Sequence, residues 1–133
     1  MTRIATTSLL ALLLITTGCV SYIQAPEAIG RVYDAETGQP LRGARVTRSA
    51  MNQSWYLPQG LPEKTVTTGR YGRFRVPEAR GWDLLLHLHE TPESFTAGYR
   101  IDADGYTGTN VTGFANSNTL WRVELGHIDI TRQ

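Results

Sequence analysis

Short stretches of alternating apolar and polar residues, separated by Gly, Pro, Asn and Asp, follow one another from position 29 to the end of the chain. Because successive side chains of a strand point to opposite faces, each stretch predicts a strand with one buried face. No stretch combines the helical period with the length of a helix, so the pattern predicts an all-β sandwich. The expected strands cover residues 29–33, 44–48, 65–68, 73–76, 82–89, 99–103 and 121–130.

Three local features refine this prediction. The last strand has apolar residues at odd positions up to Leu125 and at even positions from Ile128, which predicts a β-bulge near Gly126-His127. The strands 65–68 and 73–76 are expected to form a hairpin that ends at Pro77. The remaining long segments, 49–64 and 107–118, are expected to be surface loops.

The first 18 residues follow a different pattern. One positive charge, Arg3, precedes an uncharged Leu-rich run over residues 4–15, which is typical of a secretory signal. This run of about 12 residues is shorter than the roughly 20 that a helix needs to cross a membrane. The end of the signal, Thr-Thr-Gly followed by Cys19, resembles the bacterial lipobox, although the usual Leu is replaced by Thr16. The resemblance implies cleavage before Cys19 and acylation of its thiol.

This interpretation predicts a signal peptide over residues 1–18, a lipidated tether over 19–28 and a domain over 29–133. Acyl chains contribute about 0.8 kcal/mol per buried methylene, so several chains on Cys19 would hold the protein on a membrane. Cys19 is the only cysteine, which excludes an internal disulfide and leaves a free thiol or an intermolecular bridge as alternatives to lipidation. Val20 rather than Asp follows it, which favours the outer membrane of the cell envelope.

Composition and charge exclude some classes of protein and partner. With 133 residues, 41% of them hydrophobic, the chain is long enough for one ordinary domain and too apolar for a disordered one. The 13 basic and 12 acidic residues leave a formal net charge of +1, which argues against a nucleic-acid partner.

Two blocks of sequence resemble a known family. Residues 30–46, which read GRVYDAETGQPLRGARV, match the opening Gly-x-Val-x-Asp and Thr-Gly-x-Pro-Leu-x-Gly-Ala-x-Val of carboxypeptidase regulatory-like domains. Residues 68–77, TGRYGRFRVP, resemble the family's second block. The resemblance implies a seven-stranded antiparallel Greek-key sandwich of the transthyretin-like (prealbumin-like) type. In it, Gly38 is expected at a positive φ, and Gly43 and Ala44 are expected to let the second strand pass close to its neighbour.

The resemblance also implies a non-catalytic accessory or interaction module, because most such domains serve that role. Two enzyme groups share the architecture, but the chain lacks the terminal motif of the hydroxyisourate hydrolases. It also lacks the spacing of the two Tyr and two His that hold iron in intradiol dioxygenases. We therefore expect no enzymatic activity and no cofactor, and a partner that is an envelope protein or a glycan. The alternative is a structural or assembly role in which an open sheet edge pairs with a partner strand.

The candidate binding residues are exposed aromatics with a basic neighbour: Trp55 and Tyr56 in the loop 49–64, and Tyr71 with Arg70 in the hairpin turn. Arg73 and Arg75 lie close to them in the sequence, and a charged outer strand face explains the same residues equally well. A third hypothesis is metal binding by His87 and His89, which lie two apart on one strand and so about 7 Å apart on one face. A solvated polar face is the ordinary explanation of that pair.

Overall fold

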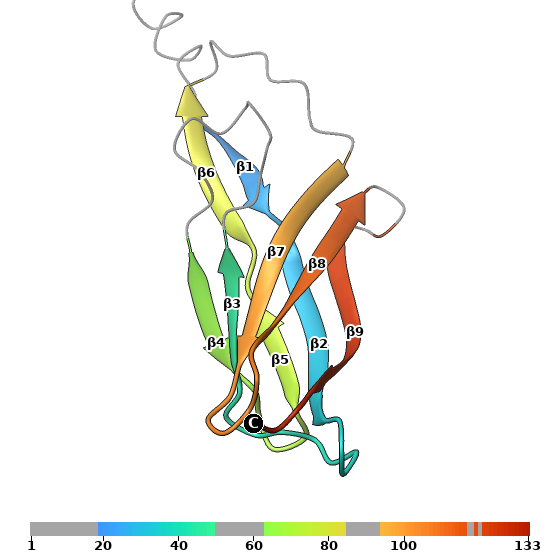
Figure 1. The fold of residues 1–133 in the computed structure, drawn as a ribbon. Coiled ribbons are helices and arrows are strands. Elements are labelled where there is room, and N and C mark those ends of the chain that lie inside the picture. The colour runs from blue at the N-terminus through green and yellow to red at the C-terminus, as the bar shows by residue number, and fades with distance from the viewer. Residues whose placement is uncertain (1–18, 50–62, 85–93, 117–118, 120) are drawn as a thin grey trace, which may run out of the picture.

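The computed structural model describes residues 19–49, 63–84, 94–116, 119 and 121–133, and these residues form strands and turns without an α-helix (Figure 1). No helix among them could span a membrane. The strands are β1 (Cys19–Ala25), β2 (Glu27–Asp34), β3 (Arg45–Ser49), β4 (Lys64–Thr67), β5 (Arg73–Val76), β6 (Ala79–Leu84), β7 (Ser94–Asp102), β8 (Thr109–Asn116) and β9 (Arg122–Ile130).

Two sheets pack face to face as a β-sandwich (Figure 1). One has the order β5-β2-β9 and the other the order β4-β3-β7-β8. Apolar side chains from both sheets meet in one buried cluster, in which Val32, Val46 and Ile101 are completely buried. The alternation in the sequence therefore identified the buried faces correctly, and the predicted all-β sandwich is confirmed.

The described residues contain nine strands rather than the expected seven. The segment 107–118 was expected to be a loop, but it contains β8. Its exposed positions are Asn110, Thr112 and Phe114, whereas Gly113 and Ala115 are buried, so the segment lacks a regular alternation of apolar and polar residues. The expectation of wholly antiparallel pairing is also wrong, since β2 and β9 run parallel.

The second additional strand, β1, lies in the segment expected to be a tether and pairs with β6. Together β1 and β2 on one side and β5 and β6 on the other form a single antiparallel ribbon that is interrupted once. The interruption falls at Pro26 and Pro77, which occupy the same level of the two chains. Proline has no N–H for the ladder, so both strands break there.

The expected hairpin of residues 65–68 and 73–76 is wrong, although both strands exist. β4 pairs with β3, and β5 pairs with β2, so the turn between them carries the chain from one sheet to the other. Gly72 at this corner has φ 67°, and its carbonyl accepts a hydrogen bond of 2.9 Å from the N–H of Val32. Thr68 closes the corner: its hydroxyl donates to the carbonyl of Leu41 and accepts from the N–H of Ala44 at 3.0 Å.

The predicted bulge in the last strand is confirmed. Ile29 is opposite Glu124 and Gly30 is opposite Gly126, so Leu125 is the extra residue in β9. Gly126 has φ 66°, a conformation that glycine adopts at little cost. The bulge restores the inward direction of Ile128, which is buried.

The turn after β2 also follows the sequence prediction, with one difference. Gly38 has the expected positive φ of 68°, and its N–H donates to the carbonyl of Asp34 at 2.8 Å. Gly43 was expected to permit a close approach, but nothing lies within 4 Å of the position that a Cβ would take. Its φ of 80° is the reason for glycine there, and the neighbouring Ala44 alone is packed in the core.

Candidate functional site

The outer face of the sheet β5-β2-β9 carries most of the charged side chains of its three strands. Residues of β2 alternate between the core and solvent, so that Val32 is buried whereas Arg31 is exposed. The same alternation directs Arg73 and Arg75 of β5 outward. We call this surface the basic face; it consists of Glu27, Ile29, Arg31, Tyr33, Arg73, Arg75, Arg122, Glu124, His127 and Asp129.

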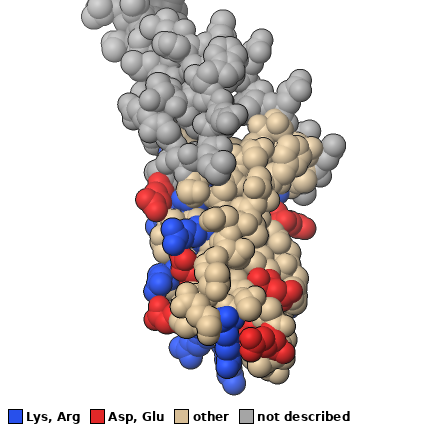
Figure 2. All heavy atoms as spheres, in the orientation of Figure 1, with Lys and Arg blue, Asp and Glu red and all other residues tan. Residues whose placement is uncertain are grey.

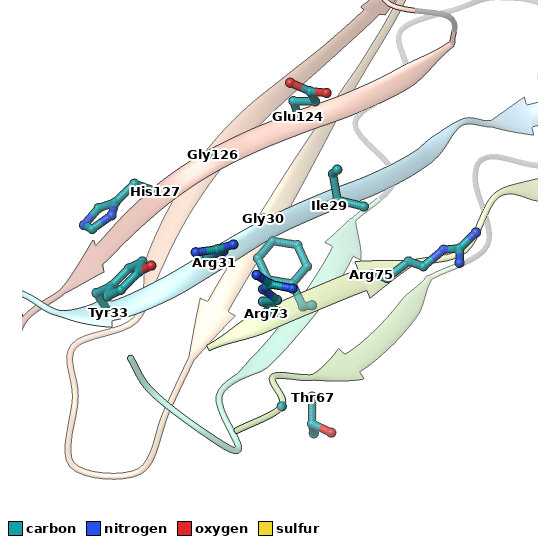
Figure 3. Close-up of a pocket in the computed structure, with 12 residues that line it drawn as sticks. Ile29, Gly30, Arg31, Tyr33, Thr67, Arg73, Arg75, Glu124, Gly126 and His127 are labelled. Carbon is teal, nitrogen blue, oxygen red and sulfur yellow. The ribbon is translucent and has the colours of Figure 1, made fainter. Parts of the chain in front are cut away.

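One row of the basic face contains three basic side chains in direct register. Arg31 is the pairing partner of Arg73 on β5 and of His127 on β9. Adjacent strands are about 4.8 Å apart, and residues directly opposite have their Cβ atoms about 5 Å apart. Like charges at such positions destabilise a sheet. Figure 3 shows Arg31 and Arg73 on adjacent strands, with Tyr33 and His127 beside Arg31.

The arginines of this face divide into paired and unpaired ones. Arg75 donates from Nε to Oε2 of Glu27 at 2.6 Å, and Nε of Arg122 lies 3.2 Å from Oε1 of the same carboxylate. Glu27 is thus enclosed by two guanidinium groups, and its side chain is only 16% exposed. Arg31 and Arg73 form no ion pair or side-chain hydrogen bond with any residue that the structure describes. They are the two guanidinium groups on the face that remain available to an external anion.

An aromatic pair borders the unpaired arginines. The rings of Tyr33 and His127 are stacked, with centroids 4.0 Å apart and planes 9° apart. Nε2 of His127 also lies 2.8 Å from Oδ1 of Asp129, which fixes the orientation of the imidazole. The pair presents a preformed flat group next to Arg31.

The floor between these side chains is shallow and apolar. Gly30 and Phe74 are paired in register, and both point to the core side of the sheet, where a Cβ on Gly30 would come within 2.7 Å of the buried Phe74 ring. On the outer side, Ile29, Gly30 and Arg73 line a depression together with Tyr33 and His127 (Figure 3). The depression therefore combines a preformed aromatic wall, an apolar floor and two unneutralised cations.

A second cluster of charged groups lies at the end of the sandwich where the chain terminates. Asp34 is buried, and its carboxylate accepts hydrogen bonds from the Tyr106 hydroxyl at 2.8 Å and from Arg132 Nε at 3.0 Å. The N–H groups of Glu36 and Thr37 donate to its other oxygen at 2.8 and 3.1 Å. All four donors come from the protein itself, which makes this cluster a structural lock on the turn and the C-terminus.

The same contacts explain the acidity of Asp34. The pKa of Asp34 is lowered to about 2, chiefly by the hydrogen bond from Tyr106, which outweighs the opposite effect of burial. The N–H groups of Glu36 and Thr37 and the charge of Arg132 contribute to the same lowering. The carboxylate is therefore ionised wherever the fold is intact at ordinary pH.

A buried arginine is the third unusual feature. Arg48 of β3 is 2% exposed and is paired in register with Tyr99 of β7, which is 1% exposed. Nη1 of Arg48 donates to the carbonyl of Pro77 at 3.0 Å, while its Nε and the Tyr99 hydroxyl have no hydrogen-bond partner among the residues that the structure describes. Burial lowers the pKa of Arg48, and it raises the pKa of Tyr99 to about 12 against the opposing effect of the Arg48 charge.

The structure places some of the sequence-predicted site residues. Tyr71 is 63% exposed, and the Arg70 guanidinium lies 5.7 Å from the centre of its ring, so these two form an exposed cation-π pair in the β4–β5 corner. Trp55 and Tyr56 lie outside the described residues, and their grouping with Tyr71 stays a prediction. Cys19 is the first residue of β1.

The predicted metal pair, His87 and His89, also lies outside the described residues. His127, the remaining histidine, lies on β9, which pairs with β2, whereas β6 pairs with β1. Among the described residues, no group of three or more His, Cys, Asp or Glu side chains is placed to hold a metal ion.

Sequence reasoning missed Arg31, Tyr33 and His127 as members of a site. The sequence shows that each points outward from its strand, but it does not show that β2 lies between β5 and β9. The parallel pairing of β2 with the C-terminal strand brings together residues that are almost 100 positions apart. One signal for the site was available in the sequence. Gly30 and Phe74 belong to the two family-like blocks, and the strands that carry them, β2 and β5, pair in this sheet.

The sequence matches no protein-family model and no curated protein. Among solved structures, the β-sandwich is distantly similar to 3-chlorocatechol 1,2-dioxygenase from Rhodococcus opacus 1CP, with 14% sequence identity and a TM-score of 0.48, over 84% of this chain and 62% of that one. A mutant of catechol 1,2-dioxygenase from Acinetobacter radioresistens gives 11% identity and a TM-score of 0.47, over 83% of this chain and 53% of that one. The chain therefore spans less than two thirds of the length of either protein.

Proposed function

We propose that this protein is a non-catalytic lipoprotein of the cell envelope whose sandwich binds another envelope component through the basic face. The observation that carries the proposal is the register of Arg31 and Arg73, two exposed guanidinium groups placed side by side without a carboxylate in the described residues to neutralise them. Holding like charges together costs stability, which a binding role for them would explain.

The remaining parts of the proposal come from the sequence. Cys19 is the acylated residue, and its chains hold the protein on the membrane, with the outer membrane favoured by Val20. The two blocks at 30–46 and 68–77 support a Greek-key domain of the carboxypeptidase regulatory-like type. Tyr71 and Arg70 supply a further exposed contact, at the β4–β5 corner.

Affinity capture from detergent-solubilised envelopes tests the binding role. The wild-type protein should enrich one specific component, and a variant with Arg31→Glu and Arg73→Glu should lose it. Arg75→Gln is the matched control, because it removes one positive charge from the same face but from an arginine that Glu27 already neutralises. Equal capture by the wild type and the double variant would contradict the proposal.

The anchor is tested separately by metabolic labelling with a fatty acid. Label should appear in the wild-type protein and be absent from Cys19→Ser. An unmodified mature N-terminus in the mass spectrum would remove the lipoprotein part of the proposal.

A second function, assembly through a sheet edge, is favoured by one observation on β8. This strand ends the sheet β4-β3-β7-β8 and has no charged residue, whereas the other edge strands of the two large sheets, β4, β5 and β9, all carry charges. Charged side chains protect edges against pairing with other chains. Phe114 of β8 is 52% exposed, and the centre of the surface seen in Figure 2 is formed by uncharged residues.

This alternative predicts that β8 pairs with β8 of a second copy. Thr112→Lys places a charge on the exposed side of the edge strand and should convert a dimer to a monomer in light scattering. Thr96→Lys on the exposed side of the interior strand β7 is the control. A monomeric wild-type protein at micromolar concentration would exclude the alternative.

A further inference from the structure

The side chains of the basic face restrict the chemical class of ligand that it can bind. This inference rests on the binding role proposed above. Two guanidinium groups in direct register match the oxygens of a phosphate or carboxylate, because each group presents a planar fork of N–H donors. Arg75 and Arg122 do not compete for the ligand, since both already bind Glu27.

The aromatic pair of Tyr33 and His127 places a second requirement on the ligand. The rings of Tyr33 and His127 are stacked beside Arg31, so each ring holds the other in place and keeps its outer face for a ligand. Aromatic rings offer sugar rings and other flat apolar groups a large contact area at a low cost in conformational entropy. Asp129 holds the His127 ring in place, so the surface is formed before a ligand arrives.

The charges on the face also exclude a class of ligand. Glu124 and Asp129 lie on β9, on either side of the row of Arg73, Arg31 and His127. A long polyanion would have to pass these carboxylates. A single anionic group attached to a compact ring fits the row better.

We infer that the Arg31 and Arg73 pair binds the phosphate or carboxylate of an acidic saccharide, and that Tyr33 and His127 contact its sugar ring. The anionic group lies between the two guanidinium groups, and the ring lies over the depression lined by Ile29 and Gly30. The arginines supply affinity for the anionic group. Contact of the sugar ring with the aromatic pair makes an anion attached to a sugar bind more tightly than the free anion.

Calorimetric titration of the full-length protein in detergent tests this, with glucose 1-phosphate, glucuronate, inorganic phosphate and glucose as probes. Glucose 1-phosphate and glucuronate should bind, glucose should not, and inorganic phosphate should bind at least about fivefold more weakly than glucose 1-phosphate. Loss of both charge-assisted contacts in the variant with Arg31→Gln and Arg73→Gln should weaken glucose 1-phosphate by about tenfold to a hundredfold. Arg75→Gln should change its affinity less than about threefold.

A further variant separates the two parts of the site. Tyr33→Ala should reduce the affinity for glucose 1-phosphate to that for inorganic phosphate and leave the latter unchanged. Because these side chains lie on the outer face of the sheet, thermal unfolding of each variant serves as the check that the fold is retained.

Three results would overturn the inference: equal affinity for inorganic phosphate and glucose 1-phosphate, equal loss in Arg75→Gln and the double variant, or no binding of either acidic sugar. If no acidic sugar binds but the envelope capture still depends on Arg31 and Arg73, this inference fails and the proposed function stands. If acidic sugars bind but the capture does not depend on those arginines, the proposed envelope role fails instead.

Discussion

The hydroxyl of Tyr106 donates a hydrogen bond of 2.8 Å to the carboxylate of Asp34, although the two residues are 72 positions apart in the chain. Arg132 binds the same carboxylate oxygen from the C-terminal segment. These contacts join the turn after β2, the turn after β7 and the end of the chain at one point. A buried carboxylate therefore joins three segments at the end of the sandwich where the chain terminates (Figure 1).

Tyr106→Phe should destabilise the protein. The substitution removes only the hydroxyl, which donates to a charged acceptor, and hydrogen bonds of this kind contribute about 1.5 kcal/mol or more. Urea denaturation followed by circular dichroism measures the change in the free energy of unfolding. An unchanged midpoint would show that Arg132 and the backbone donors hold Asp34 without Tyr106.

The same substitution at Tyr99 should have the opposite sign. The Tyr99 hydroxyl is buried without a partner, so its removal ends a desolvation cost of about 1 kcal/mol and leaves the ring packing intact. Tyr99→Phe should therefore be neutral or stabilising in the urea experiment that tests Tyr106→Phe. A loss of more than about 1 kcal/mol would mean that the hydroxyl has a partner in solution.

Asp34 should make the fold sensitive to acid. Its pKa in the folded protein, about 2, is below its ordinary value of 3.8, so the unfolded chain takes up a proton that the folded chain does not. The resulting stability is fully present above about pH 4 and is lost as the pH falls toward 2. Unfolding free energies measured between pH 6 and pH 2 should fall in this range.

Two variants test whether Asp34 causes this loss of stability at low pH. Asp34→Asn should flatten the part of the pH dependence that lies between about pH 4 and pH 2. Tyr106→Phe removes the largest cause of the low pKa, so the loss of stability in acid should be smaller and should end at a higher pH. If the free energy of unfolding falls equally at low pH in Asp34→Asn and in the wild type, other carboxylates cause the loss.

Gly72→Ala should be far more damaging than Gly38→Ala. Both glycines have a positive φ, which costs any other residue about 1 kcal/mol or more. A Cβ on Gly72 would also lie 2.3 Å from the carbonyl oxygen of Val32, whereas nothing lies within 4 Å of the corresponding position at Gly38. We expect a loss of about 1 to 2 kcal/mol for Gly38→Ala and more than about 3 kcal/mol for Gly72→Ala.

The midpoints of thermal and urea unfolding of Gly38→Ala and Gly72→Ala check this prediction. Equal losses at the two positions would mean that the corner between β4 and β5 relaxes away from Val32. Such a relaxation would also weaken the pairing of β2 with the start of β5, because the Gly72 carbonyl accepts the hydrogen bond of the Val32 N–H.

The parts of the fold that depend on local pattern were predictable, and those that depend on register were not. The phase change in the last strand located the bulge at Leu125, and Pro77 ended β5 as expected. The pairing of β5 with β2 instead of β4 was not predictable, since the spacing of a tight turn favours a hairpin. β8 escaped detection because Thr, Asn and Gly make up most of the strand, and its apolar residues do not alternate regularly with the polar ones.

The candidate site depends on the same long-range information. Arg73 and Arg75 were visible as a basic pair in the sequence, but they differ in the structure because Glu27 neutralises only Arg75. Glu27 reaches it across a strand pair that is 48 residues apart in the chain. The distinction between a neutralised and an available arginine is thus a property of the pairing of β2 with β5.

The central claim, that the basic face is the side that contacts another envelope component, is tested most directly by photo-crosslinking in living cells. A photoreactive phenylalanine analogue at Ile29 lies on the basic face, and the same residue at Thr96 lies on the outer face of the other sheet. The account predicts a discrete crosslinked product from position 29 that disappears when Arg31 and Arg73 are replaced by Gln, and none from position 96. A product from position 96 alone, or from neither position, would contradict it.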